Sequence, residues 1–237
     1  PTALLSAHPG ITGGSFLDLT EEMTRITEHW EQIGLRFDGI YSGFLGSAEQ
    51  IDVVERVIRR FRGSSMVIVD PVLGDHGKAY RTCTPELCRG MRQLAEQADV
   101  ITPNLTEAAI LLERPYEEIQ ACDAAAVVQK LSRDGRRSVV LTGYSAAEGQ
   151  TGALCFDHLS GQVQAVQTFR EPQDFSGTGD LFASVLTGGL VGGIPLFQAA
   201  QAAAEFVRAC VSRTLREGLT ETDGVDFEPL LGQLATR

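Results

Sequence analysis

Short β-branched runs alternate with helical patterns along most of this chain, and this alternation limits its fold more than any other feature. In residues 65–69, every residue after Ser65 is apolar, as expected of a strand that is buried on both faces of a sheet. Residues 51–61 instead place apolar side chains at i, i+3, i+4 and i+7, which predicts an amphipathic helix. Strands that alternate with such helices form βα units, so we expect an α/β protein with a mainly parallel sheet.

The same patterns set the order of the expected elements. We predict strands at residues 2–6, 38–42, 65–69, 99–103 and 139–142. Capping residues and periodicity predict helices that start at Thr20, Ser47, Thr84-Pro85 and Asn104, and two Ala-rich helices at about 179–190 and 195–215. After the last of these strands, residues 152–157 and 162–166 flank the turn 158–161, which predicts an antiparallel hairpin at the sheet edge.

Composition and charge narrow the class of protein. A chain of 237 residues with 43% hydrophobic content can bury one core, and no linker divides it, so we expect a single domain over residues 1–237. The net charge of −11 and the lack of a Lys/Arg cluster argue against nucleic-acid binding. No apolar run is long enough to span a membrane. The cysteines are scattered without a C-x-x-C pair, which predicts reduced, mostly buried thiols in a cytoplasmic protein: Cys83, Cys88, Cys122, Cys155 and Cys210.

Polar residues and glycines gather where the predicted strands end. Open α/β sheets bind ligands at the carboxyl ends of their strands, so residues from different βα turns should face one crevice. The candidates are Ser42, Gly43, Asp70, Thr102, Asn104, Thr142, Gly143 and the segment 175–180.

The segment Ser176-Gly177-Thr178-Gly179-Asp180 directly precedes a predicted helix. Its glycines let successive backbone N–H groups point into one space, and the helix start adds partial positive charge. Such a turn suits a phosphate, or the charge that develops as a phosphoryl group is transferred. Asp180 would repel a phosphate, yet it suits a general base that takes the proton of an attacking hydroxyl. The alternative is that Gly179 and Asp180 form only a turn and a helix cap.

Two further acids and one loop fit the same chemistry. Asp70 follows a buried strand, where its carboxylate either faces a magnesium–nucleotide complex or caps the turn. Glu107 closes a capping box with Asn104, a structural task that we rank above direct catalysis, and it could still hold a magnesium-bound water. The polar, Gly-bounded loop 74–80 is either a flap over a ligand or a solvated loop.

His8 follows the first predicted strand and could stack on or hydrogen-bond a substrate ring, although a lone histidine is more often structural. The other histidines have no metal-ligand spacing with it: His29, His76 and His158. No Ser/His/Asp or Cys/His arrangement and no G-x-x-x-x-G-K-[ST] phosphate loop occur in the sequence.

Together these motifs resemble the ribokinase superfamily and, within it, the pyridoxal kinases. The resemblance spans nearly all of the chain, in the same order, and rests on Pro1–His8, Ser42–Gln50, Asp70–Gly74, Ile101–Glu107 and Phe175–Asp180. The stretch Ser42–Gln50 is the most specific to pyridoxal kinases, whereas the other motifs are shared more widely among vitamin kinases. The resemblance implies a three-layer α/β/α sandwich with a mainly parallel central sheet and an antiparallel edge hairpin.

The resemblance also implies an activity, the transfer of the γ-phosphate of ATP to the 5′-hydroxyl of pyridoxal, pyridoxine or pyridoxamine. It implies Asp180 as the catalytic base and Gly177, Thr178 and Gly179 as the anion hole. It implies that Asp70 and Glu107 organise Mg²⁺ and that the loop 74–80 covers ATP. Nucleotide contacts are implied for Asp70, Thr102, Asn104, Glu107, Thr142, Gly143 and Ser176, and substrate contacts for His8, Tyr41, Ser42, Gly43 and Asp180.

The chain departs from this family in two places. The family begins with a further strand and helix that contact the pyridoxal ring, so we expect the natural chain to start upstream of Pro1. Pro9 and Gly10 follow His8 where relatives often carry a hydroxyl residue, which leaves the preferred vitamer open. The alternatives are a hydroxymethylpyrimidine kinase of thiamine metabolism and a non-catalytic protein that binds a vitamin or a nucleotide. The resemblance further suggests a homodimer and leaves a role for K⁺ open.

Overall fold

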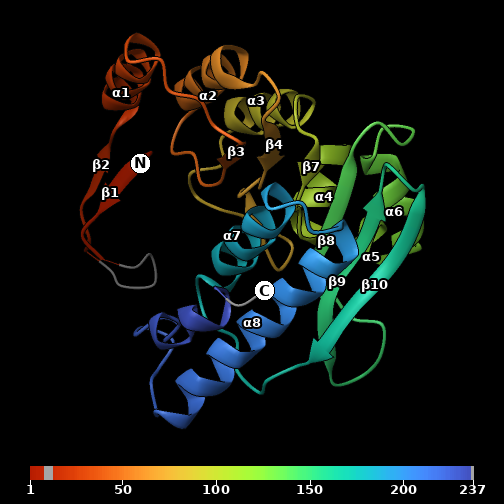
Figure 1. Cartoon of the computed structure of the whole chain (residues 1–237). Coiled ribbons are helices and arrows are strands. Elements are labelled where there is room, and N and C mark those ends of the chain that lie inside the picture. Colours follow the sequence, from red (N-terminus) through yellow and green to blue (C-terminus); the bar gives the residue numbers. More distant parts are fainter. Residues whose placement is uncertain (8–12, 236–237) are drawn as a thin grey trace.

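The computed structural model describes residues 1–7 and 13–235. Its centre is a six-stranded sheet in the order β10-β9-β8-β7-β4-β3 (Figure 1). Four strands are parallel, namely β3 (Gly39–Ser42), β4 (Met66–Val69), β7 (Val100–Ile101) and β8 (Ser138–Tyr144). An antiparallel hairpin completes one edge with β9 (Gln150–Asp157) and β10 (Gln162–Phe169). The predicted mainly parallel sheet with an edge hairpin is therefore confirmed.

Helices cover both faces of the sheet and make it the middle of three layers (Figure 1). One face carries α2 (Ala48–Phe61), α3 (Pro85–Ala95), α4 (Leu105–Leu112) and α6 (Ala124–Leu131). The other face carries α7 (Thr178–Val191) and α8 (Leu196–Arg216). Outside these layers, α1 (Thr20–Gln32) contacts α2, α5 (Tyr116–Ala121) contacts α4, and a short 3-10 helix covers Glu228–Gln233.

Successive strand residues point alternately into two apolar cores. Val67 and Val69 of β4 pack in the core with α2, α3, α4 and α6, whereas Ile68 faces α7 and α8. All three side chains are at most 1% exposed. Burying each of them contributes about 2 kcal/mol, so the uninterrupted apolar run at residues 66–69 reflects burial on both faces.

Two short ribbons lie outside the main sheet. β1 (Ala3–Leu5) and β2 (Phe16–Asp18) pair antiparallel in a two-stranded sheet of their own, which projects beside the molecule in Figure 1. The predicted strand at residues 2–6 thus exists, but it pairs only within this ribbon. β5 (Gly74–Asp75) and β6 (Lys78–Ala79) form the second ribbon.

One helix start differs from the prediction. Leu19, and not Thr20, is the residue before the first turn of α1. The backbone N–H of Thr20 donates to Asp18 Oδ1 at 2.7 Å, so the acid two residues earlier satisfies the helix start. Among the described residues, no helix is both long and apolar enough to cross a membrane.

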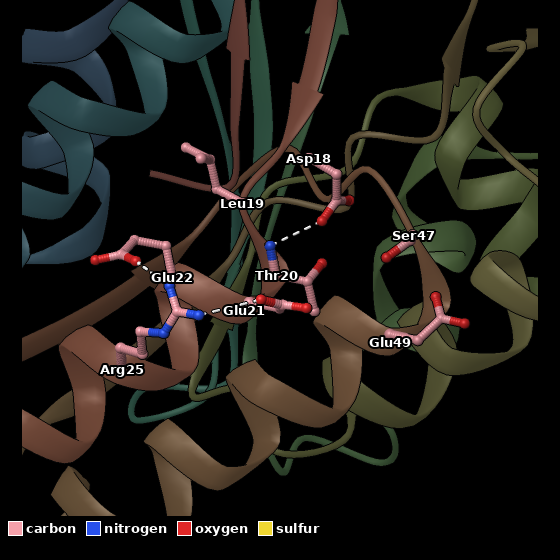
Figure 2. Close-up of a pocket in the computed structure, with 8 residues that line it drawn as sticks. All are labelled: Asp18, Leu19, Thr20, Glu21, Glu22, Arg25, Ser47 and Glu49. Carbon is pink, nitrogen blue, oxygen red and sulfur yellow. Dashed lines mark hydrogen bonds and ion pairs between the residues drawn. The ribbon is translucent and has the colours of Figure 1, made fainter.

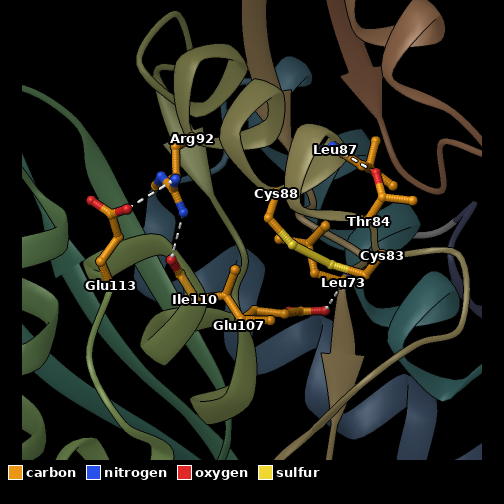
Figure 3. The surroundings of a disulfide bond; sticks show 9 residues. All are labelled: Leu73, Cys83, Thr84, Leu87, Cys88, Arg92, Glu107, Ile110 and Glu113. Carbon is orange, nitrogen blue, oxygen red and sulfur yellow. Dashed lines mark hydrogen bonds and ion pairs between the residues drawn. A yellow bond between two sulfur atoms is a disulfide. The ribbon is translucent and has the colours of Figure 1, made fainter.

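Two of the cysteines also differ from the prediction, because Cys83 and Cys88 form a disulfide (Figure 3). Thr84 caps α3, and its hydroxyl accepts a hydrogen bond from a backbone N–H at 3.2 Å. Cys83 therefore lies directly before the cap and Cys88 four residues after it, the two positions whose side chains meet in a hydrophobic staple. The prediction of reduced thiols is wrong for this pair. The free cysteines are Cys155 and Cys210, both buried, and the exposed Cys122.

Candidate active site

Asp70 stands at the centre of the predicted site, directly after β4. Its backbone N–H donates to the carbonyl oxygen of Ser42, at the end of β3, over 2.8 Å. One carboxylate oxygen accepts a hydrogen bond from Thr102 Oγ1 at 2.9 Å, and the other accepts one from Tyr41 Oη at 3.2 Å. The parallel register of β3, β4 and β7 thus joins residues that the sequence placed at three separate strand ends.

Burial changes the acid–base behaviour of this cluster. Asp70 is 8% exposed. Burial raises the pKa of its carboxyl to about 7, the hydrogen bond from Thr102 opposes this shift, and the negative charge of Asp180 adds to it. Burial and the charge of Asp70 also raise the pKa of the Tyr41 phenol, which therefore stays a hydrogen-bond donor. A carboxyl whose pKa lies near neutrality at a strand end is typical of a site for metal binding or proton exchange.

The turn before α7 supplies the second half of the site. Gly177 precedes the first helical turn with φ of 86°, a left-handed conformation that glycine adopts without strain. Thr178 Oγ1 donates to the Phe175 carbonyl at 3.1 Å and closes the turn. A Cβ atom at Gly177 or Gly179 would meet no other atom within 4 Å, so the space over the helix start is open to a ligand.

Asp180 lies in the first turn of α7, at the mouth of this open space. The residue is accessible to solvent, and partial burial of its carboxyl raises its pKa. Its charge in turn raises the pKa of Asp70, so the two carboxylates share one electrostatic neighbourhood. The helix start and the β4 end therefore face the same region, as the sequence predicted.

Glu107 and Asn104 form the predicted capping box at the start of α4, which is confirmed. Glu107 Oε2 accepts from the Asn104 backbone N–H at 2.8 Å, and Asn104 Oδ1 accepts from the Glu107 N–H at 2.9 Å. The other carboxylate oxygen of Glu107, Oε1, accepts a bond from the N–H of Leu73 at 3.2 Å (Figure 3). Burial, together with the charge of Asp70, raises the pKa of Glu107 well above its usual range. Glu107 thus caps α4 and also lies close enough to Asp70 for the two carboxyl groups to interact electrostatically.

Residues 74–80 form a hairpin, β5–β6, and not an irregular loop. His76 and Gly77 have φ of 49° and 76°, as in the tight turns that join two antiparallel strands. The N–H of Gly77 donates to Thr106 Oγ1 at 2.8 Å, and Asn104 Nδ2 donates to the carbonyl of Gly74 at 2.8 Å. The turn of the hairpin, at Gly77, and the start of β5, at Gly74, are therefore both hydrogen-bonded to the start of α4. That it covers a nucleotide stays a prediction.

The other predicted residues lie at strand ends or beside the helix start. Thr142 and Gly143 lie directly before Tyr144, the last residue of β8, and a Cβ atom at Gly143, whose φ is 71°, would meet no atom within 4 Å. A Cβ atom at Gly43 would lie 2.9 Å from the hydroxyl of Tyr41, so this glycine makes room for the phenol. Ser176 is exposed beside Gly177, and His8 lies outside the described residues. The binding roles assigned to all these residues stay predictions.

The acidic pair Asp70 and Glu107 suits a hard divalent cation. Within the described part of the chain, no group of three or more His, Cys, Asp or Glu side chains could hold a metal ion. Mg²⁺, however, is usually bound by one or two carboxylates, the phosphate oxygens of a substrate, and water. The donor set therefore fits a cation that is shared with a nucleotide, and not one that the protein holds alone.

A cavity of about 620 Å³ opens elsewhere, between the starts of α1 and α2 (Figure 2). Among the residues that line it are Asp18, Glu21, Glu22 and Glu49, and Arg25 forms ion pairs with Glu21 at 3.2 Å and Glu22 at 3.0 Å. Of the predicted site residues that the structure describes, none lines this cavity. Its excess of carboxylates disfavours a phosphate, so we place the candidate site at the strand ends.

Two contacts of the site were not predicted. The sequence places Tyr41 and Asp70 at neighbouring strand ends, but it contains no signal for the hydrogen bond between them. Thr106 is the third residue of the predicted capping box, where a hydroxyl is free to accept a bond from outside the helix. Its partner, the N–H of Gly77 in the β5–β6 hairpin, lies 29 positions away in the chain and could not be identified from local sequence.

Comparison with known proteins assigns the family. The family model described as phosphomethylpyrimidine kinase matches residues 23–224. The chain belongs to this family. The pyridoxine/pyridoxal/pyridoxamine kinase of Bordetella avium is 35% identical over 177 residues, which cover 71% of this chain and 57% of that protein. This chain therefore spans a little over half the length of that curated relative.

Solved structures of the family share the fold. The pyridoxal kinase of Lactobacillus plantarum matches with a TM-score of 0.91 at 31% identity, over 100% of this chain and 84% of that one. A Bacteroides thetaiotaomicron protein assigned to the phosphomethylpyrimidine kinases, in a crystal form with pyridoxal, matches with a TM-score of 0.89 at 36% identity, over 99% and 84%. The resemblance to ribokinase-like pyridoxal kinases is therefore confirmed for family and fold.

Proposed function

We propose that this protein transfers the γ-phosphate of ATP to the 5′-hydroxyl of pyridoxal and related B6 vitamers, giving pyridoxal 5′-phosphate and ADP. One observation carries the proposal: the open, glycine-lined start of α7 holds Asp180 in the same electrostatic neighbourhood as the buried Asp70. Backbone amides that face a site for an anion, with a carboxylate beside them, suit phosphoryl transfer to an alcohol.

Each residue has a defined task in this step. Asp180 accepts the proton of the alcohol as its oxygen attacks the γ-phosphorus, the bond from that phosphorus to the β–γ bridging oxygen breaks, and ADP leaves. The amides of Gly177, Thr178 and Gly179 stabilise the negative charge on the phosphoryl oxygens in transfer. Mg²⁺ bound with the nucleotide would neutralise phosphate charge, and Asp70 and Glu107 are the residues that would hold it.

The remaining site residues would bind the two substrates. Nucleotide contacts are proposed for Thr102, Asn104, Thr142, Gly143 and Ser176. Acceptor contacts are proposed for His8, Tyr41, Ser42 and Gly43. The hydroxyl oxygen of Ser42 supports this assignment, because it is buried at the end of β3 and has no hydrogen-bond partner among the described residues. A substrate hydroxyl or ring nitrogen would satisfy it.

Two observations bear on which alcohol is the acceptor. The Bacteroides relative is found with pyridoxal, and the stretch Ser42–Gln50 resembles pyridoxal kinases, which favours a B6 vitamer. The description of the family model, phosphomethylpyrimidine kinase, names a pyrimidine substrate, which supports hydroxymethylpyrimidine as the second candidate acceptor. The two acceptors are both hydroxymethyl groups on an aromatic nitrogen ring, so the phosphoryl-transfer chemistry is the same for each.

A direct competition separates the candidates. The protein is incubated with Mg-ATP and equal concentrations of pyridoxal and hydroxymethylpyrimidine, and both phosphorylated products are quantified by mass spectrometry. We expect pyridoxal 5′-phosphate as the main product. Phosphorylation of the pyrimidine alone would overturn the substrate assignment. Calorimetric binding of ATP and pyridoxal without any product would instead support the non-catalytic alternative.

A further inference from the structure

Gln50 is a polar side chain in the core, with 0% of its surface exposed, in the first turn of α2. Its Oε1 accepts a hydrogen bond from the backbone N–H of Gly46 at 2.8 Å. Its Nε2 donates to the carbonyl of Thr2 at 2.7 Å and to Asp18 Oδ2 at 3.1 Å. One amide thus joins the loop between β3 and α2 to both strands of the β1–β2 ribbon.

Other contacts cross the same junction. Thr2 Oγ1 donates to the carbonyl of Phe44 at 2.9 Å. A Cβ atom at Gly46 would lie 2.9 Å from the ring of Phe16, so the ribbon packs directly on the loop. In the part of the chain that the structure describes, the ribbon forms a sheet of its own and has no strand pairing with the six-stranded sheet (Figure 1). The junction therefore helps to place the ribbon, and Gln50 is its fully buried polar side chain.

The loop leads straight to the acceptor side of the site. Residues 43–47 follow Tyr41 and Ser42, and Gly43 packs against the Tyr41 hydroxyl that donates to Asp70. Gly46 is only three residues from Gly43, so a shift of Gly46 would also displace the backbone near Gly43. Figure 2 shows the ribbon side of the junction, where Asp18 lies near Ser47 and Glu49 of the α2 start.

We propose that Gln50 is a positioning residue for the acceptor alcohol: its amide fixes the β1–β2 ribbon and the loop 43–47 in the arrangement that presents Ser42 and Gly43. Its kinetic consequence rests on the proposed function. Only an amide offers the acceptor for Gly46 and the donors for Thr2 and Asp18 in one side chain. Gln50 touches neither substrate in this account, and it acts through the loop.

The first test replaces Gln50 by Met, which has a similar length and no hydrogen-bonding amide. We expect the KM for pyridoxal to rise about tenfold, because the loop and the ribbon lose all three hydrogen bonds of the buried amide and part of that loss should appear as weaker binding of the acceptor. The KM for ATP should stay within twofold and kcat within threefold. A general loss of folded protein would lower kcat without this selective change. An unchanged KM for pyridoxal, or an equal rise in both KM values, would overturn the proposal.

Two variants provide matched comparisons. Ser132→Ala removes a buried hydroxyl, 1% exposed, that bonds Gln129 and Gly135 at the end of α6, far along the sheet order from β3. It should lower stability without changing either KM. Asp18→Ala removes the exposed carboxylate that accepts hydrogen bonds from Gln50 Nε2 and from the Thr20 N–H, and it leaves the buried amide intact, so it tests the same contact. We expect the KM for pyridoxal to rise about threefold, because the substitution removes one of the three hydrogen bonds of the Gln50 amide. An unchanged KM would count against a role of the ribbon contact.

The geometric claim is tested without catalysis. Hydrogen exchange followed by mass spectrometry should show faster exchange of the β1–β2 ribbon in Gln50→Met, with exchange of α8 unchanged. If the parent protein phosphorylates neither alcohol, the proposed function fails while this measurement still decides the role of Gln50. Equal exchange of the ribbon in parent and variant would contradict that role.

Discussion

Replacing Tyr41 by Phe tests whether the phenol keeps Asp70 ionised. Tyr41 Oη donates to Asp70 Oδ2 over 3.2 Å, while Thr102 bonds the other oxygen at 2.9 Å. A hydrogen bond to a charged group contributes about 1.5–3 kcal/mol, and the longer distance places this one near the lower value. Because 1.36 kcal/mol is a tenfold change in an equilibrium, Asp70 should ionise about ten times less readily in Tyr41→Phe.

The pKa of Asp70, about 7, sets the size of the effect. At pH 7 about half of the Asp70 carboxyl is ionised in the parent, and about a tenth would be ionised in Tyr41→Phe. If Asp70 holds Mg²⁺, the apparent affinity for the ion should fall about fivefold at pH 7. Near pH 9 the difference should almost vanish, because the carboxyl is deprotonated in both proteins.

The assay measures ADP formation against free Mg²⁺ at fixed ATP, at pH 7 and at pH 9. Tyr80→Phe is the matched control, since it removes a phenol from the end of the β5–β6 hairpin whose hydroxyl makes no hydrogen bond in the described part of the chain. An unchanged Mg²⁺ dependence at pH 7 would show that the Tyr41 phenol does not control the ionisation of Asp70. A loss of equal size at pH 9 would show that Tyr41 acts in another way.

Two further predictions concern stability. Burial raises the pKa of Asp70 and of Glu107, so the native state binds more protons than the unfolded state, and the free energy of unfolding without Mg²⁺ should fall as pH rises. The part due to Asp70 should be lost between about pH 4 and about pH 7, where its carboxyl titrates in the native state. Urea unfolding at several pH values measures this dependence. The free energy of unfolding of Asp70→Asn should change less steeply with pH than that of the parent, and an equal slope in both proteins would contradict the prediction. Replacing Cys83 and Cys88 by Ser should lower the free energy of unfolding by about 2 kcal/mol, because the bridge closes a short loop. The exposed Cys122→Ser variant should change it little, and equal effects would count against a stabilising bridge.

Local patterns were sufficient for the parallel sheet and its edge hairpin. The apolar run at residues 66–69 predicts a strand because both of its faces are buried, and the turn at 158–161 lies between two alternating runs. Asn104 and Glu107 predict their own capping box because both partners lie within one helical turn. Each of these features depends on residues that are close in the sequence.

Contacts between distant segments were not predictable in the same way. Gln50 lies on an amphipathic helix, where a polar side chain is expected to face solvent, yet its partners Thr2 and Asp18 are 48 and 32 positions away. The hydrogen bond from Tyr41 to Asp70 depends on the register of β3 and β4, which apolar patterning leaves open.

The disulfide is an intermediate case, because its signal was local and was overlooked. Thr84 and Pro85 already predicted the start of α3, and Cys83 and Cys88 lie directly before and four residues after that cap. Staple positions bring side chains together, so the predicted cap was sufficient to predict the proximity of the two thiols. The two cysteines are five positions apart, so they do not form a C-x-x-C motif, and only the predicted helix start could have indicated the pair.

In the proposed mechanism, Asp180 takes the proton of the acceptor alcohol at the start of α7. Single-turnover phosphorylation of pyridoxal with Asp180→Asn, together with calorimetric measurement of ATP binding, tests this role. We expect a rate about 10²–10⁴ times lower, the usual share of a general base, with the Kd for ATP nearly unchanged. A single-turnover rate equal to that of the parent would contradict it.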